Sequence, residues 1–212
     1  EERRDLRATA EAHLHLGRVV IDADPQRSLA ELDRAAAAYA EAGDLGGEAR
    51  VEIARGFVRQ HDAGVAQQLA GLERSYHLAM RSADTRLQAS CAQQLAMHHA
   101  FSTGRQEFET WAERSRDMSR RDDLAVEPRL QVAWSALAMY ELDPVRGRET
   151  AHEALTAGRA LGLRDAYANA LITAVDLAVL AGDADESRSL LTEAREFAAT
   201  RPSPWWGLQY DL

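Results

Sequence analysis

The chain contains no lysine. All 25 of its basic residues are arginine, so no side chain can form the Schiff base that lysine forms with carbonyl substrates. A phosphate-binding P-loop is excluded as well, because that motif needs its lysine to reach the phosphates. The absence of lysine therefore removes two classes of chemistry before any motif is considered.

Cysteine and long apolar runs are equally scarce. Cys91 is the single cysteine, so no disulfide can form within the chain. No run approaches the roughly 18 apolar residues that span a membrane, and no apolar stretch of a signal peptide follows Glu1-Glu2-Arg3-Arg4. We therefore expect a cytoplasmic protein without a membrane partner. Because the chain lacks an initiator Met and ends in an apolar stretch, we interpret it as a piece of a longer protein.

The composition is that of a helical, acidic protein. Glycine (13) and proline (5) are sparse among the 212 residues and lie mostly between periodic segments. The formal net charge is -9. Direct nucleic-acid binding is not expected, because it needs a basic surface.

A block of four residues recurs along the chain at a spacing of about 40 residues. The first two steps are 40 residues each, and weaker copies follow after steps of 39 and 40. A fixed period of this size is typical of one supersecondary unit repeated along a solenoid. The copies are Leu32-Asp33-Arg34-Ala35, Leu72-Glu73-Arg74-Ser75, Ala112-Glu113-Arg114-Ser115, Ala151-His152-Glu153-Ala154 and Leu191-Thr192-Glu193-Ala194.

Each period is predicted to hold two helices, A and B, separated by turns. The predicted fold is all-α, a right-handed solenoid of about five antiparallel helix pairs in one domain over 1–212. The units are about 1–44, 45–84, 85–123, 124–163 and 164–201, and 202–212 starts a truncated sixth unit or caps the fifth. The A helices are predicted at about 4–21, 46–61, 85–101, 127–141 and 165–181. The B helices are predicted at about 25–42, 65–82, 105–121, 145–161 and 184–199.

One small residue occupies an equivalent place in every predicted B helix. A small side chain there allows neighbouring helices to approach closely, so we expect all five to be buried. They are Ala35, Ser75, Ser115, Ala154 and Ala194.

The fifth unit carries the clearest motif. Gly182-Asp183 is followed by acidic residues, a small Ser187, then Leu191 and Ala194. This pattern resembles the tetratricopeptide repeat (TPR), although the period is nearer 40 than about 34 and most of the family's first-helix Trp and Tyr are missing. Longer units of this kind resemble the repeat regions of large bacterial LuxR-type and related ATP-dependent transcriptional regulators, and those of actinobacterial proteases with a repeat-bearing sensor region.

The sequence shows no catalytic or metal-binding motif. His13 and His15 diverge by about 200° on a helix, and no His-Glu-x-x-His or Cys-His spacing is present. Glu31 and Arg34 are expected to form an exposed ion pair, and Glu193 belongs to a solvated acidic face. We therefore predict no enzyme activity, no metal and no cofactor.

A binding groove is the remaining candidate site, because the A helices line the concave face in the family that the chain resembles. Arg55 and Arg59 share one helix face and could together hold an anionic group; the alternative is that both are solvated. Met97 and Met139 could offer adaptable apolar contacts or simply fill the core. The predicted groove residues are Arg55, Arg59, Gln93, Met97, Met139, Asn169 and Asp176.

Three functions stay open at this point. The leading hypothesis is a non-catalytic scaffold that binds a protein or peptide partner, or a small-molecule effector, for a larger transcription-regulatory protein. The first alternative is a sensor that holds a small molecule or peptide in the concave groove, and the second is self-association into a homo-oligomer through Trp205-Trp206. A chaperone-tail clamp is disfavoured, because its members use Lys and Asn and this chain has no Lys and one Asn, Asn169.

Overall fold

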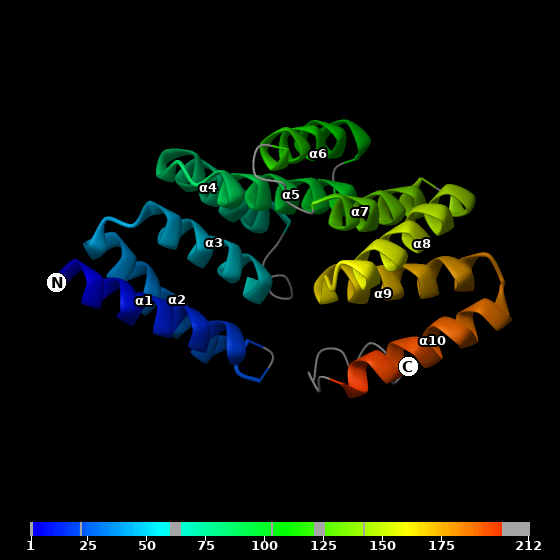
Figure 1. Ribbon diagram of the computed structural model, residues 1–212, viewed down its shortest axis with the longest axis horizontal. Coiled ribbons are helices and arrows are strands. Elements are labelled where there is room, and N and C mark those ends of the chain that lie inside the picture. Colours follow the sequence, from blue (N-terminus) through cyan, green and yellow to red (C-terminus); the bar gives the residue numbers. More distant parts are fainter. Residues whose placement is uncertain are drawn as a thin grey trace. The chain divides into compact units, whose positions relative to one another are not determined.

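The computed structural model is built from helices (Figure 1). It describes residues 2–21, 23–59, 65–102, 104–120, 126–141 and 143–200. No strand occurs within these ranges, so the all-α prediction is confirmed. The helices are α1 (Glu2–Val19), α2 (Pro25–Ala42), α3 (Leu45–Arg59), α4 (Val65–Ser82), α5 (Thr85–Ser102), α6 (Arg105–Ser119), α7 (Glu127–Tyr140), α8 (Pro144–Ala160), α9 (Arg164–Leu180) and α10 (Ala184–Ala199).

The observed helices coincide with the predicted A and B helices. The bounds of α2, α4 and α10 are those predicted, and every other helix end lies within two residues of its predicted place. The predicted Trp205-Trp206 cap lies outside the described residues. Within the described part of the chain, no helix combines the length and hydropathy needed to cross a bilayer.

Aspartates set the starts of the B helices α2, α8 and α10. The side chains of Asp24, Asp143 and Asp183 each accept a hydrogen bond from the backbone N–H three residues later, which satisfies a donor that the first helical turn leaves free. At the other end of α2, Gly43 takes the left-handed conformation (φ 67°) and caps the helix. Ala83 adopts the same conformation (φ 58°) after α4, where the sequence offers no glycine.

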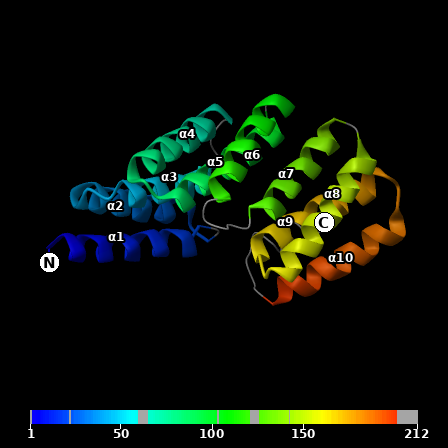
Figure 2. The ribbon, with the colours of Figure 1, turned by 45° about the horizontal axis from the view of Figure 1, so that its top comes forward.

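The helices group into two compact units. Unit 1 comprises Glu1–Leu95 and Glu113–Leu124, and unit 2 comprises Ala96–Ala112 and Ala125–Leu212. In unit 1, one core lies among α1, α2 and α3 around Leu32 and Tyr39. In unit 2, the core joins α7, α8, α9 and α10, which lie side by side in both views (Figure 1; Figure 2). The predicted division into five repeat units and a sixth partial one stays a prediction.

The repeated small residues are completely buried in their helices. All five have an exposed fraction of 0%, as expected for places where helices approach closely. The two serines also satisfy their hydroxyl groups: Ser75 Oγ donates to Leu72 O at 2.8 Å, and Ser115 Oγ donates to Ala89 O of α5 at 3.0 Å. The small residue therefore lets helices approach closely without leaving a buried polar atom unpaired.

A glycine at the start of α3 makes a second close approach. The ring of Tyr39 is fully buried against Gly47. A Cβ at Gly47 would lie 2.1 Å from Tyr39 Cδ1, whereas a Cβ at Gly46 would meet nothing closer than 3.5 Å. The large aromatic ring can pack between α2 and α3 only because residue 47 has no side chain.

We predict that Gly47→Ala lowers the free energy of unfolding by about 1–3 kcal/mol through overpacking against Tyr39. Gly46→Ala is the matched control, and it should be neutral or stabilising, because alanine favours a helix by about 1 kcal/mol over glycine. Urea denaturation of both variants measures the difference. Equal stabilities of the two variants would contradict the close contact between Gly47 and the Tyr39 ring.

Candidate functional site

The predicted groove residues lie on the A helices, as expected. Arg55 is on α3, Gln93 and Met97 on α5, Met139 on α7, and Asn169 and Asp176 on α9. Arg59 ends α3, and its side chain lies outside the described part of the chain. Arg55, Arg59 and Gln93 belong to unit 1, and the other four belong to unit 2. A groove that unites all of them stays a prediction.

Arg55 is engaged in a chain of ion pairs within unit 1. Its guanidinium contacts Asp33 of α2 and Glu52 of α3, each at 2.5 Å, and Glu52 also accepts from Arg74 of α4 at 3.0 Å. The Arg55 side chain is only 17% exposed. An incoming anion would have to displace two carboxylates from it. Arg55 therefore ties α2, α3 and α4 together in the structure as it stands.

The middle groove residues are largely packed. Gln93 is buried and Met97 half-buried on α5. Met139 packs against the core cluster of unit 2, so of the two roles predicted for it, the structure displays core filling. Asn169 is half-buried, and its backbone oxygen accepts from Thr173 Oγ at 3.0 Å.

Asp176 differs from the other predicted groove residues. Asp176 is exposed on α9. Its carboxylate makes no ion pair or hydrogen bond with any residue that the structure describes. Partial desolvation raises its pKa above the ordinary value. Val179 and Leu180, one turn further along the same face of α9, are 61% and 66% exposed. Among the described residues, Asp176 is thus an acid without a partner beside exposed apolar side chains.

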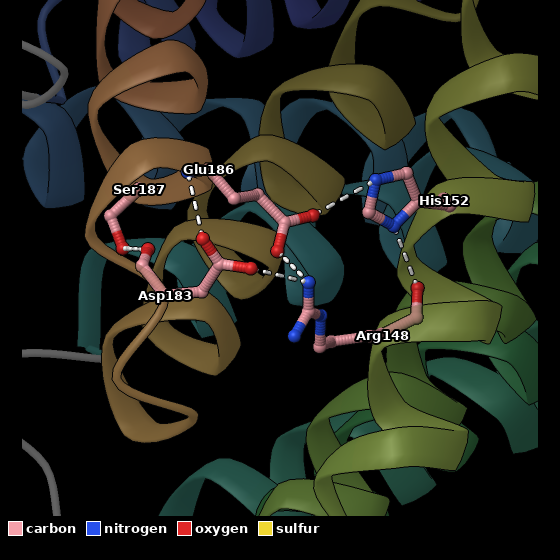
Figure 3. Close-up of polar contacts among 5 residues, drawn as sticks. All are labelled: Arg148, His152, Asp183, Glu186 and Ser187. Atoms are coloured by element: carbon pink, nitrogen blue, oxygen red, sulfur yellow. Dashed lines mark hydrogen bonds and ion pairs between the residues drawn. The ribbon is translucent and has the colours of Figure 1, made fainter.

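A polar cluster that the sequence did not predict joins α8 to α10 (Figure 3). Arg148 pairs with Asp183 at 3.1 Å and with Glu186. The ring of His152 lies between the Arg148 carbonyl oxygen, 2.9 Å from Nδ1, and Glu186 Oε1, 3.3 Å from Nε2. Hydrogen bonds from the Glu186 backbone N–H and from Arg148 lower the pKa of Asp183.

This α8–α10 cluster links two successive B helices through side-chain contacts. One carboxylate oxygen of Glu186 faces Arg148 and the other faces His152. The Asp183 oxygen that does not face Arg148 accepts the backbone N–H of Glu186 and so caps α10. No group of three potential metal ligands occurs among the residues described. The sequence did contain one signal for this cluster. Arg148 and Asp183 are 35 residues apart, which is close to one repeat. Residues at that separation lie near each other when the B helices of adjacent units pack together.

Two expectations about carboxylates are wrong. Glu31 is only 5% exposed, because His13 Nδ1 lies 2.6 Å from its Oε2 while Arg34 contacts its other oxygen. The hydrogen bond to His13 is the main cause that lowers the pKa of Glu31. Glu193 is not merely solvated, because it accepts hydrogen bonds from Arg159 and Tyr167.

Comparison with known proteins places the fold. No protein-family model matches the chain, and no curated protein matches it. It is similar to the crystal structure of a Signal Transduction ATPase with Numerous Domains (STAND) protein with a tetratricopeptide repeat sensor from Pyrococcus horikoshii, with a TM-score of 0.58 and 9% identity. The alignment covers 97% of this chain and 32% of that one, so the chain spans about a third of that protein. At this identity the likeness shows the fold alone, a TPR-like helical solenoid.

Replacing Arg55 by Met should lower the free energy of unfolding by about 1–3 kcal/mol, because Glu52 and Asp33 lose a charged donor. Arg188→Met, which removes an exposed pair with Asp185, should cost at most about 1 kcal/mol. Guanidinium denaturation of both variants tests the comparison. A smaller loss for Arg55 than for Arg188 would show that Arg55 does not tie the helices together.

Asp176→Asn should stabilise the folded chain at neutral pH, because the amide avoids a partly desolvated charge. Since folding raises the pKa of Asp176, the folded chain binds this proton more tightly than the unfolded chain does. Its contribution to stability therefore falls as pH rises through the unfolded and then the folded pKa. The stabilising effect of the substitution should shrink between pH 7 and about pH 4.

Denaturation curves at the two pH values measure this difference. Asp185→Asn, an exposed acid on α10 that pairs with Arg188, is the matched control, because it lacks the desolvation that should make the Asp176 variant more stable. An Asp176→Asn variant that is less stable at neutral pH would rule out a desolvated, unpaired carboxylate.

Proposed function

We propose that the chain is a non-catalytic sensing or docking module of a larger bacterial transcription-regulatory protein in the cytoplasm. The observation that carries the proposal is the structural similarity of 97% of the chain to part of a STAND protein with a tetratricopeptide repeat sensor. A second support is chemical: the described ion pairs, such as Arg55 with Asp33 and Arg148 with Asp183, join helices to one another.

The module would act by shifting the conformational equilibrium of the domains attached to it. Within unit 2, consecutive helices contact one another: α7 contacts α8, α8 contacts α9, and α9 contacts α10. In such an array, a ligand that binds adjacent helices favours one relative arrangement of them, which shifts the population of states in linked domains. The exposed face of α9 around Asp176 offers a contact region for a protein or peptide partner.

One observation favours the alternative of a small-molecule sensor. An open hollow on unit 2 is lined by Arg159 of α8, Tyr167 of α9, Glu193 and Phe197 of α10, and Thr200, which caps α10. The phenol of Tyr167 and the ring of Phe197 meet edge to face, with centroids 5.2 Å apart. Charged groups and an aromatic floor together suit a polar ligand with an apolar part. The other alternative, a homo-oligomer through Trp205-Trp206, stays a prediction.

The proposal predicts that the purified chain binds members of an amphipathic peptide panel or of a metabolite panel without turning any of them over. Thermal-shift measurements detect binding, since a ligand at roughly 100 times its dissociation constant adds about 2.7 kcal/mol of stability. Mass spectrometry of the recovered ligands detects turnover. Chemical conversion of a ligand, or no binding by either panel, would overturn the proposed function.

Light scattering on the same sample addresses the remaining alternative. We expect a monomer at high concentration. A dimer that Trp205→Ala with Trp206→Ala dissolves would favour self-association over docking as the function.

A further inference from the structure

The α9 face formed by Asp176, Val179 and Leu180 is the counterpart of a face that is covered in the preceding repeat. The backbone fixes the correspondence: Asp143 N–H donates to Ala138 O after α7, and Asp183 N–H donates to Ala178 O after α9, both at 2.9 Å. A shift of 40 residues therefore places Asp176 at the position of Ala136 and Val179 at that of Met139.

These equivalent positions have very different surroundings. Ala136 is 0% exposed, and Met139 packs against the core cluster to which α9 contributes Leu171 and Ala174. Val179, in contrast, is 61% exposed. Within unit 2, α7 contacts both α8 and α9. The corresponding face of α9 is open among the described residues, and its geometry suits another helix.

The charge at this face restricts what can cover it. A helix that closed over Asp176 would remove the remaining water from a carboxylate that has no partner in the described part of the chain. Burying an unpaired charge is unfavourable, whereas burying it with a matching cation and a hydrogen bond is tolerated. An alanine stands at the same place in α7, so the acid is not needed for stacking one repeat on the next.

We propose that the face of α9 formed by Asp176, Val179 and Leu180 docks an amphipathic helix of a partner protein that carries one arginine among apolar side chains. The apolar residues of the partner cover Val179 and Leu180, and its guanidinium pairs with the Asp176 carboxylate, for which a planar, two-pronged donor is well matched. This inference rests on the proposed docking function and specifies the chemistry of the partner.

Other occupants make different demands. A neutral or acidic helix would leave Asp176 unpaired, and a small anion would be repelled by it. If a second copy of this chain or its own residues 201–212 occupied the face, the face would be covered in the purified protein before any partner is added. The raised pKa of Asp176 agrees with a carboxylate whose hydration is already incomplete before a partner arrives.

The test uses the full chain and three helical peptides that share one apolar stripe. The peptides differ only at a central position, which is Arg, Gln or Glu, and fluorescence anisotropy gives their dissociation constants. We expect the Arg peptide to bind the wild-type chain at least about tenfold more tightly than the Gln peptide, the scale of a hydrogen bond to a charged group. The Glu peptide should bind most weakly.

Variants of the chain identify the contact. Asp176→Asn should remove the preference for Arg, and Asp176→Arg should reverse it so that the Glu peptide binds best. Val179→Ser with Leu180→Ser should weaken all three peptides alike, because it removes the shared apolar contact. Asp185→Asn, an acid on the exposed surface of α10, should leave every constant unchanged.

The outcomes separate this inference from the proposed function. Tight binding of all three peptides with no effect of Asp176→Asn would overturn the arginine contact and leave the docking function standing. No binding of any peptide, together with no hit in the metabolite panel, would remove both. If peptides bind only after Trp205→Ala with Trp206→Ala, the chain's own C-terminal residues occupy the face and the partner helix is rejected.

Discussion

Close approach of helices at one small residue per repeat is the constraint on which this fold depends. Ala35 and Ser75 in unit 1, and Ala154 and Ala194 in unit 2, are completely buried. A larger side chain at such a place would push the helices apart, because protein cores are too densely packed to absorb extra volume. The leucine and tyrosine side chains around these positions can form the core of each unit only while that spacing is kept.

Arginine performs most of the charged contacts between helices. Arg55 joins α2 and α3, while Arg148 joins α8 and α10. A guanidinium can contact two carboxylates at once, as both of these do. Part of the acidic excess of the chain therefore serves internal contacts, because one arginine can engage two carboxylates. Against that background, the carboxylate of Asp176, which has no partner among the residues that the structure describes, is a feature that stacking does not explain.

The fold was largely predictable and the site was not. The 40-residue period located each helix, because a cap such as Asp183 and a stop such as Gly162 act on the residues next to them in sequence. The role of Arg55 depends on Asp33, 22 residues away on another helix, and no local pattern reveals which carboxylate a long flexible side chain will meet. Glu31 was misjudged for the same reason, since its partner His13 lies on α1.

The sequence by itself determined the helix bounds, the all-α class and the buried small positions, because all three follow from periodicity and local capping. Only the tertiary structure decided which charges are paired and which faces are covered. Ala136 and Asp176 occupy the same place in the repeat, yet one is buried and the other is exposed. The difference arises because burial depends on which helix packs on a face, and that is a property of the assembled array rather than of the residue.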